Sequence, residues 1–520
     1  MTTVCASSAQ PQLKPQGVVV PRGDGQLSLE LDSNDAGPRD ECGVVGIWAP
    51  GEEVAKLTYF GLYALQHRGQ EAAGIAVSDA ARTVVYKDTG LVAQVFDETT
   101  LAPLTGHVAI GHTRYSTTGA NTWDNAQPTL GTTSAGTSLA LAHNGNLINT
   151  ADLAKEAANL NLDIGASTSD TALMTALLTA RPDESITASA QKVLPQLRGA
   201  FSLVFMDDNT LYAARDPEGF RPLVLGRLSN GWAVASETAA LDTIGATIVR
   251  EIEPGELLSI DEHGMRSERF APARPKNCIF EYIYLARPDS VLAGRNVYAT
   301  RVEVGRRLAR EQVVEADLVI GVPESGIPAA IGFAEESGIP YGLGFTKNSY
   351  VGRTFIQPSQ SLRQLGIRLK LNPLHDQIRG KRIVVVDDTI VRGNTQRQIV
   401  RMLREAGAVE VHVRISAPPI QWPCFFGIDF ASRAELIAGN LDVDGIRKNI
   451  GADSLGYVSM EGLTAATEQP ASRLCRACFD GDYPLELPAS SLLGKNLLES
   501  GGESGEESST NRSQRQRSEA

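Results

Sequence analysis

The sequence has no uninterrupted apolar run as long as a membrane span, and its first residues contain no basic stretch followed by an apolar one. These absences predict a protein that neither crosses a membrane nor carries a secretion signal, so we expect it in the cytoplasm. Basic residues are in the minority, since 48 Lys and Arg face 61 Asp and Glu, for a formal charge of −13. That balance argues against nucleic acid as the main partner.

Cysteine is scarce, with 6 among 520 residues. In a cytoplasmic chain, thiols more often serve metal binding or catalysis than disulfides. The six positions are Cys5, Cys42, Cys278, Cys424, Cys475 and Cys478.

The composition divides the chain into four stretches, and its length predicts two or three domains. Residues 1–41 are rich in Pro, Gly, Ser and Asp and predict a flexible leader, while residues 488–520 predict a disordered tail. Residues 42–270 carry many short apolar runs and few helical segments, which predicts a layered α+β domain. In residues 271–487 strands and helices alternate, which predicts an α/β domain with a parallel sheet.

The most informative run is residues 383–395. Four β-branched residues predict a buried strand that ends at Asp387 and Asp388, and a loop of small and hydroxyl residues leads into a helix. Ligands of open α/β sheets bind at this end of a strand, where a helix N-terminus favours phosphate. Paired carboxylates suit the hydroxyls of a sugar and a Mg²⁺ ion. No Walker loop lies nearby, and the run predicts a sugar-phosphate site rather than a solvated Asp-Asp turn.

This run resembles the phosphoribosyl-pyrophosphate (PRPP) signature of type I phosphoribosyltransferases. The resemblance implies that Asp387 and Asp388 bind the ribose hydroxyls and one Mg²⁺ per subunit, with Ser325 as a further Mg²⁺ ligand. Residues 347–374 look like the flap of that family, in which Lys347 and Arg353 offset pyrophosphate charge. The remaining PRPP positions implied are Thr389, Val391, Arg392, Gly393, Asn394 and Thr395.

Cys42 begins a predicted strand, where a lone cysteine is more often a small core residue. Three further clusters change this interpretation: Gln-His-Arg-Gly-Gln-Glu at 66–71, Gly-His-Thr-Arg-Tyr-Ser-Thr at 111–117, and His-Asn-Gly-Asn-Leu at 143–147. With Ser-Thr-Ser-Asp at 167–170 they resemble, in order and spacing, the class II glutamine amidotransferases over roughly residues 42–270. These are N-terminal-nucleophile hydrolases, so the resemblance implies αββα layers.

The resemblance also implies a role for each matching residue. Cys42 attacks the side-chain amide of glutamine, while the Asn144 side chain and the Gly145 N–H stabilise the oxyanion. The remaining glutamine-site positions are Arg114 for the α-carboxylate, Asp170 for the α-ammonium, and Arg68 with Gly69 beside the nucleophile.

Nucleophiles of this family act through a free α-amino group, which titrates near ~7.7–8.0 and can serve as a base at neutral pH. Cys42 is internal, so we expect residues 1–41 to be a propeptide that is cut between Glu41 and Cys42. A mis-chosen start codon or a retained regulatory tail is the alternative. Because the amine supplies the base, a structural role is favoured for His67, His112 and His143.

An amidotransferase half followed by a phosphoribosyltransferase half resembles the amidophosphoribosyltransferase family, over about residues 42–485. The resemblance implies that ammonia from glutamine displaces pyrophosphate from PRPP in the first step of purine biosynthesis. It also implies feedback by purine nucleotides and a homodimer or homotetramer. Two alternatives are a catalytically inactive PRPP-binding regulator and another glutamine-dependent sugar-phosphate transferase.

Four of the other cysteines, with the Cys-x-x-Cys pair among them, suit either tetrahedral zinc or an iron–sulfur cluster. Aromatic residues flank these cysteines. They resemble the cluster-bearing branch of the family, which implies one [4Fe-4S] cluster per subunit, bound by Cys278, Cys424, Cys475 and Cys478. Cys5 lies in the leader and needs no function.

Overall fold

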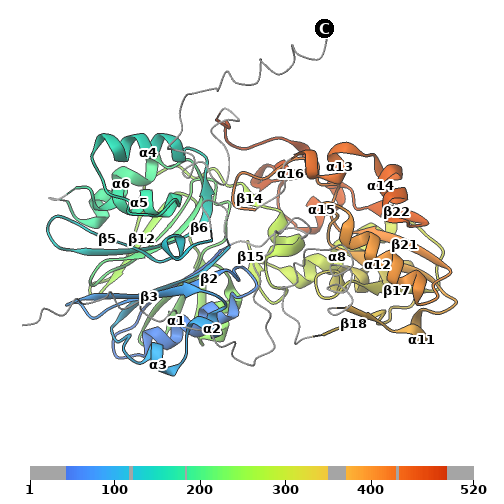
Figure 1. The fold of residues 1–520 in the computed structure, drawn as a ribbon, viewed down its shortest axis with the longest axis horizontal. Helices are drawn as coiled ribbons and strands as arrows, with labels where there is room; N and C mark the ends of the chain where they lie inside the picture. The colour runs from blue at the N-terminus through green and yellow to red at the C-terminus, as the bar shows by residue number, and fades with distance from the viewer. Residues whose placement is uncertain (1–41, 116–120, 182–183, 349–370, 429–432, 489–520) are drawn as a thin grey trace, which may run out of the picture.

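The structure, a computed structural model, describes residues 42–115, 121–181, 184–348, 371–428 and 433–488. The predicted leader, Arg353 with most of the predicted flap, and nearly all of the predicted tail lie outside these residues. The described chain forms two parts that lie side by side (Figure 1). We call residues 43–269 the two-sheet part and residues 277–488 the parallel-sheet part.

The two-sheet part consists of two antiparallel sheets packed face to face. The first has the order β11-β9-β10-β1-β4-β2-β3, formed by β1 (Gly43–Trp48), β2 (Ala72–Ser78), β3 (Thr83–Thr89), β4 (Val108–Arg114), β9 (Val224–Leu228), β10 (Gly231–Ala235) and β11 (Thr247–Glu251). The second has the order β13-β12-β8-β7-β6-β5, formed by β5 (Thr129–Thr132), β6 (Ser138–Leu147), β7 (Gly199–Met206), β8 (Leu211–Arg215), β12 (Glu256–Asp261) and β13 (Gly264–Arg269).

Helices cover the outer face of each sheet. The first sheet is covered by α1 (Val54–Ala64), α2 (Val92–Val95), α3 (Glu98–Leu101) and α7 (Thr238–Thr243), and the second by α4 (Thr150–Asn159), α5 (Asp170–Thr179) and α6 (Ile186–Val193). Three apolar cores result: one under each helix layer and one between the sheets. This arrangement confirms the predicted αββα layers.

Strand β1 is apolar on both faces because both faces are covered. Val45 and Ile47 pack under the helices, while Val44 packs between the sheets. A Cβ on Gly46 would lie 2.4 Å from Cγ1 of Val204, so a residue without a side chain lets the sheets approach here.

The parallel-sheet part contains a four-stranded parallel sheet of order β17-β20-β21-β22, formed by β17 (Leu318–Gly321), β20 (Arg382–Asp387), β21 (Glu410–Ile415) and β22 (Ser454–Tyr457). One face packs on α8 (Val297–Glu311), α9 (Ile327–Ser337) and α15 (Met460–Ala466), and the other on α12 (Asn394–Glu405) and α14 (Val443–Ile450). Both faces of the sheet are therefore covered, as the β-branched sequence of β20 predicts.

Short elements complete the described chain. β14 (Asn277–Cys278) pairs with β23 (Leu474–Cys475), β15 (Val291–Leu292) with β16 (Arg295–Asn296), and β18 (Phe345–Lys347) with β19 (Leu371–Pro373). The short helices are the π-helical turn η3 (Glu281–Leu285), α11 (His375–Ile378), α13 (Ile437–Asn440), α16 (Ala477–Asp480) and four 3₁₀ turns, η1 (Trp123–Asn125), η2 (Leu194–Gln196), η4 (Arg433–Glu435) and η5 (Ala471–Arg473).

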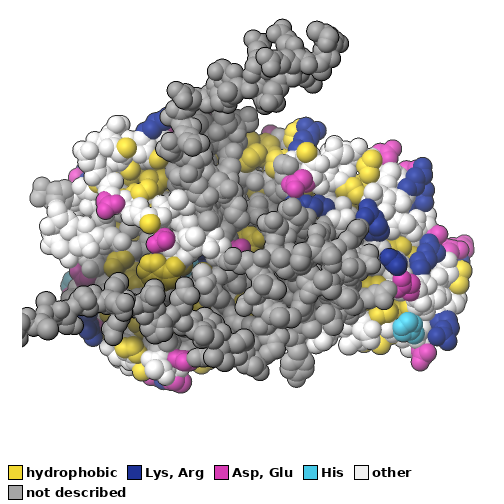
Figure 2. Space-filling view, viewed as in Figure 1, with side chains coloured by type: hydrophobic (Ala, Val, Ile, Leu, Met, Phe, Trp, Pro, Cys, Tyr) yellow, Lys and Arg dark blue, Asp and Glu magenta, His cyan; other side chains and the backbone are white. Residues whose placement is uncertain are grey.

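On the face seen in Figure 2, Lys and Arg side chains gather over the parallel-sheet part. Helices α12 and α14 carry Arg401, Arg404, Arg447 and Lys448, and each of them pairs with an acidic side chain. The charges are thus locally balanced and do not form an anion-binding patch. Among the described residues, no helix is both long and apolar enough to cross a bilayer.

Candidate active site

Cys42 lies at the start of β1, where pairing with β4 sets Gly43 opposite Thr113. This register brings Cys42 next to Tyr115, which follows β4. The Cys42 thiol donates to the Tyr115 carbonyl oxygen at 3.3 Å and accepts from the Tyr115 N–H at 3.4 Å. The predicted nucleophile is 5% exposed and held between two backbone groups of its neighbour.

Arg114 is the last residue of β4 and is buried. Burial lowers the pKa of its guanidinium, while the charges of Cys42, Glu71 and Asp170 act in the opposite direction. The predicted binders of the α-carboxylate and the α-ammonium therefore share one electrostatic environment with the predicted nucleophile. A cation and an anion placed together suit a zwitterionic amino acid.

Asp170 is the first residue of α5, and Ser169 caps that helix by accepting from the Ala172 N–H. Burial disfavours the Asp170 carboxylate, but the His143 ring 3.5 Å away and the Leu147 N–H offset this, and the pKa lies below its ordinary value. Asp170 therefore carries a negative charge at neutral pH, as an ammonium partner requires.

Asn144 lies on β6 and is fully buried. Neither its Oδ1 nor its Nδ2 atom has a hydrogen-bond partner. A buried amide without partners costs free energy, on the order of 1–3 kcal/mol, unless a ligand satisfies it. Next to it, Gly145 has φ +148°, and a Cβ there would lie 2.1 Å from the Ala200 oxygen, so only glycine fits. The pair matches the donor set of an oxyanion site.

Two of the three histidines near these residues, His67 and His112, make structural contacts. His112 donates from Nε2 to the His143 carbonyl oxygen at 3.1 Å, and burial, with the Arg114 charge, lowers its pKa to about 3. It is therefore neutral at physiological pH. His67 contacts Glu237 at 2.7 Å. These contacts agree with the structural role favoured from the sequence.

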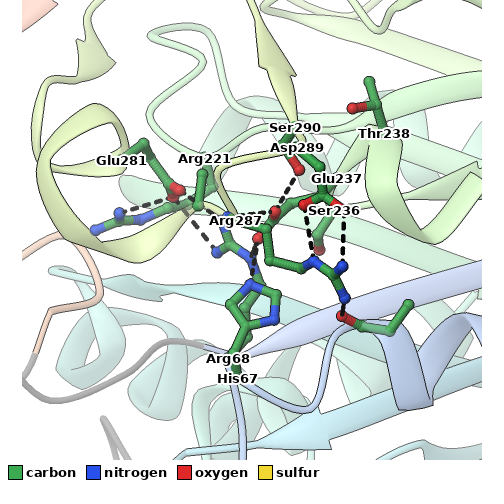
Figure 3. A network of polar contacts seen from close by, with 12 residues as sticks. His67, Arg68, Arg221, Ser236, Glu237, Thr238, Glu281, Arg287, Asp289 and Ser290 are labelled. Carbon is green, nitrogen blue, oxygen red and sulfur yellow. Dashed lines mark hydrogen bonds and ion pairs between the residues drawn. The ribbon is translucent and has the colours of Figure 1, made fainter. Parts of the chain in front are cut away.

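Arg68 is buried in a network of charged side chains (Figure 3). Its Nε donates to Glu237 at 2.5 Å and its Nη2 to Glu281 at 2.5 Å. Arg221, also buried, donates to the other oxygen of Glu281 at 3.4 Å. Glu281 belongs to η3, so this network joins the two parts of the chain. The predicted role of Arg68 at the glutamine stays a prediction.

Gly69 follows Arg68 in a tight approach to β4. A Cβ on Gly69 would lie 2.5 Å from the Thr113 carbonyl carbon and 2.7 Å from the Arg114 nitrogen. The residue therefore lets the loop at 66–70 touch the strand that carries Arg114.

At the second predicted site, Asp387 ends β20 and Asp388 follows it, and both are buried. Asp387 accepts from the Gln396 side chain, and Asp388 accepts from Ser325 and, at 2.6 Å, from Thr389. Burial and the adjacent Asp388 charge raise the pKa of Asp387 well above its usual value. Burial also raises that of Asp388, against the hydrogen bonds from Ser325 and Thr389.

The loop between β17 and α9 carries Ser325 against the two acids. A Cβ on Gly326 would lie 2.5 Å from the Val386 oxygen, so this glycine allows the loop to reach β20. Lys347 lies beside the same loop, with its Nζ 3.1 Å from Glu324. Two carboxylates and a hydroxyl form a hard oxygen set that fits Mg²⁺.

The loop from Thr389 to Gly393 leads into α12. Gly393 has φ +82° and precedes the first residue of the helix, Asn394, so its left-handed conformation starts α12. Thr395 is exposed, Val391 is buried, and Arg392 lies 3.4 Å from Glu435. A helix of this length presents N–H groups and a positive dipole end to an anion.

Four cysteines gather between the two parts. Cys278 and Cys475 are register partners of β14 and β23, and Cys478 lies in α16. Burial raises the pKa of Cys475 to about 12, and burial with the charges of Cys278, Cys424 and Cys475 raises that of Cys478. Within the described residues, no three His, Cys, Asp or Glu side chains are placed to hold a metal ion, so the predicted cluster stays a prediction.

Comparisons with known proteins agree with the predicted amidotransferase and phosphoribosyltransferase halves of the chain. A family model described as a glutamine amidotransferase domain matches residues 112–243, and one described as a phosphoribosyl transferase domain matches residues 298–418. The chain is 66% identical to the amidophosphoribosyltransferase of Mycobacterium tuberculosis over 480 residues, 90% of this chain and 91% of that protein. It is 65% identical to the amidophosphoribosyltransferase of Mycobacterium leprae over 472 residues, which are 89% of this chain and 85% of that protein.

The chain belongs to the amidophosphoribosyltransferase family. A solved structure, glutamine PRPP amidotransferase from B. subtilis in complex with ADP and GMP, matches with a TM-score of 0.81 and 47% identity over 86% of this chain and 98% of that one. As a member of this family, the chain is a glutamine amidotransferase and pentosyltransferase that acts in purine biosynthesis. These relatives give no support to the inactive-regulator alternative or to another sugar-phosphate transferase.

Several buried charged residues around the predicted site residues were not predicted from the sequence. Arg301 donates to the Tyr282 and Ala286 carbonyls at 2.8 Å, and its charge acts on Asp388. Glu237, Glu281 and Arg221 surround Arg68. A charged residue within an otherwise apolar stretch is the one signal that could have indicated them.

The raised pKa values of the acids at β20 predict a stability effect. When a carboxyl has a raised pKa in the folded state, the folded protein loses stability as pH rises. The loss begins above the ordinary carboxyl pKa, near 4, and continues up to the raised pKa. In metal-free buffer, Asp387→Asn should therefore unfold at a higher temperature than the wild type, by about 2 °C or more at pH 8, roughly what 1 kcal/mol produces. The difference in unfolding temperature between this variant and the wild type should narrow toward pH 5.

The matched control is Asp317→Asn, at the opposite end of the same sheet. Hydrogen bonds from Arg382 lower the pKa of Asp317 to about 2. This variant should be less stable than the wild type at pH 8, with the difference shrinking as pH falls toward 2. Thermal unfolding at several pH values measures both, and equal shifts in the two variants would contradict the electrostatic account.

Proposed function

We propose that the chain converts glutamine, PRPP and water into 5-phosphoribosylamine, glutamate and pyrophosphate, with Cys42 as the nucleophile. The observation that carries this proposal is Asn144, a fully buried amide with both polar atoms unpartnered, on the strand that contacts β4 through His143 and His112. An amide in this state is ready to receive an oxyanion.

In the first half-reaction, the Cys42 sulfur attacks the amide carbon of glutamine, and ammonia leaves as the thioester forms. Arg114 holds the α-carboxylate and Asp170 the α-ammonium, while Asn144 and the Gly145 N–H receive the negative oxygen. Water then hydrolyses the thioester to glutamate and restores the thiol. Losing one oxyanion donor typically costs ~3 kcal/mol of transition-state stabilisation.

In the second half-reaction, ammonia displaces pyrophosphate from C1 of PRPP. Asp387 and Asp388 bind the ribose hydroxyls, the loop from Thr389 to Thr395 and the α12 N-terminus hold the 5-phosphate, and Lys347 faces the pyrophosphate. Asp387, Asp388 and Ser325 would hold one Mg²⁺ per subunit, which offsets charge on the leaving group when bound. Arg353 would also offset negative charge on the pyrophosphate.

The proposal has further parts that follow from the family. Purine nucleotides regulate the enzyme, which assembles as a homodimer or homotetramer and acts in the cytoplasm. Residues 1–41 are a propeptide, and the α-amine of Cys42 becomes the base after cleavage. Cys278, Cys424, Cys475 and Cys478 hold one [4Fe-4S] cluster per subunit, which has no part in the transfer chemistry.

Cys42→Ala tests the central assignment. The variant lacks the nucleophile, so glutamine-dependent synthesis of phosphoribosylamine should fall by 10³-fold or more, on the order of the loss seen when a nucleophile is removed. Synthesis from added ammonia should stay near the wild-type rate, because Asp387 and Asp388 are untouched. Both rates are measured as pyrophosphate release, and glutamine-dependent release by the variant would refute the assignment.

The N-terminus of the active enzyme tests the propeptide. Intact-mass analysis of purified protein should show a chain that starts at Cys42, because an acylated α-nitrogen cannot act as a base. If cleavage is autocatalytic, Cys42→Ala should retain residues 1–41. Full glutamine-dependent activity in protein that keeps the leader would rule out the α-amine mechanism.

Metal analysis of anaerobically purified protein tests the thiol assignment. We expect about four irons per chain, as one [4Fe-4S] cluster requires. Cys424→Ser should reduce the iron content, whereas Cys42→Ala, a matched loss of a thiol elsewhere, should leave it unchanged. One zinc per chain and no iron would overturn the assignment.

A further inference from the structure

A short segment of the parallel-sheet part lies against the oxyanion strand β6 of the two-sheet part. This segment, residues 424–427, is more than 270 positions away from β6 in the sequence. The Asn146 side chain donates from Nδ2 to the Phe425 oxygen at 3.1 Å. Asn146 is the next residue after Gly145, so the contact is made directly beside the predicted oxyanion donors.

Arg221 makes a second attachment to the same segment. Its Nε and Nη2 donate to the Phe426 oxygen at 3.0 and 2.6 Å. Arg221 is completely buried, and its other end faces Glu281. The ring of Phe220 stacks on that of Phe426 at 4.4 Å with an interplanar angle of 11°. The segment is thus held by two polar groups and one aromatic contact.

Gly427 closes the contact on the backbone of Gly145. It has φ +116°, and a Cβ there would lie 3.2 Å from Arg221 Nε and 3.4 Å from the Cα of Gly145. On its other side, Gly145 is pressed against Ala200. The peptide that carries the predicted oxyanion N–H therefore lies between β7 and residues 424–427, with little room to shift.

We propose that residues 424–427 are a positioning element for the oxyanion site, acting through Asn146 and Arg221, an inference that rests on the proposed function. Donors to an oxyanion must be held in place before the reaction, and a displacement near 1 Å can reduce the rate by about 100-fold. The segment fixes β6 from outside the first half of the chain. Neither Asn146 nor Arg221 touches the substrate in this proposal.

Asn146→Ala tests the proposal by removing one attachment. Three constants are measured in the purified enzyme that starts at Cys42: kcat and KM for glutamine, and the rate with added ammonia. We expect kcat with glutamine to fall by roughly tenfold or more, with KM for glutamine within about twofold, because the oxyanion forms only after binding. The ammonia-dependent rate should stay within about twofold of the wild type.

Asn149→Ala is the matched control. Asn149 donates from Nδ2 to the Gln196 oxygen at 3.0 Å, so it is also an asparagine that binds a carbonyl just beyond Gly145, but its partner lies in the two-sheet part. All three constants should stay within about twofold of the wild type, because neither this bond nor the one that Asn149 Oδ1 accepts from the Arg198 N–H reaches residues 424–427. If Asn146→Ala does not fold, the same three constants are measured for Gly427→Ala, with the same expected result.

The outcomes separate the two proposals. Equal losses with glutamine and ammonia, no loss at all, or a rise in KM alone would each overturn the positioning role. A wild type that releases glutamate but makes no phosphoribosylamine would refute the proposed transfer only, since the positioning comparison can still be made on glutamate release. A wild type that does not hydrolyse glutamine would overturn both.

Discussion

The buried ion pairs around Arg68 are the constraint on which the arrangement of the two parts depends. A buried guanidinium needs partners for its charge and its N–H groups, because an uncompensated buried charge costs several kcal/mol. Glu237 supplies one carboxylate from the two-sheet part, and Glu281 supplies the other from η3. Glu281 also faces Arg221. Separating the two parts would therefore expose several charges to water or leave them buried without partners. The loop at 66–70, which approaches Arg114, is thereby tied to the second half of the chain.

Both candidate sites use the ends of strands, but for different physical reasons. In the two-sheet part, Cys42, Arg114 and Asn144 come from β-strands of two packed sheets, so their relative positions are set by register and by sheet spacing. In the parallel-sheet part, Asp387 lies at the carboxyl end of β20, where N–H groups of the following loop and helix are available. The first site lies within a packed core, while the second lies beside the loop that leads into α12.

The sequence predicted the fold class and the strands with buried faces well, because β-branched and apolar runs report burial directly. Strand β20 extends one residue beyond each end of the four β-branched residues, 383–386, that predicted it. Strands β3 and β13 were not predicted, since each lies at a sheet edge and has no buried residue. Helix α4 was missed because only Thr150, Leu153 and Ala157 are buried on it. Glu281 and Arg221 could not be paired from sequence, because their contact depends on how the two parts pack, which no local pattern encodes.

Buried charge is used in two opposite ways in this molecule. Around Arg68 every charge meets a partner, so the network stabilises one arrangement of the parts. Asp387 and Asp388 are two acids buried side by side, and both have raised pKa values. Arg301, a buried cation whose charge acts on Asp388, donates its hydrogen bonds to the carbonyls of Tyr282 and Ala286. The acids are therefore destabilising until a ligand with positive charge and hydroxyls arrives. In the proposed function, the stability that is lost at this strand end becomes binding energy for the sugar and its cation. This requires that the rest of the sheet hold the acids in place. The valines of β20, buried on both faces, perform that task.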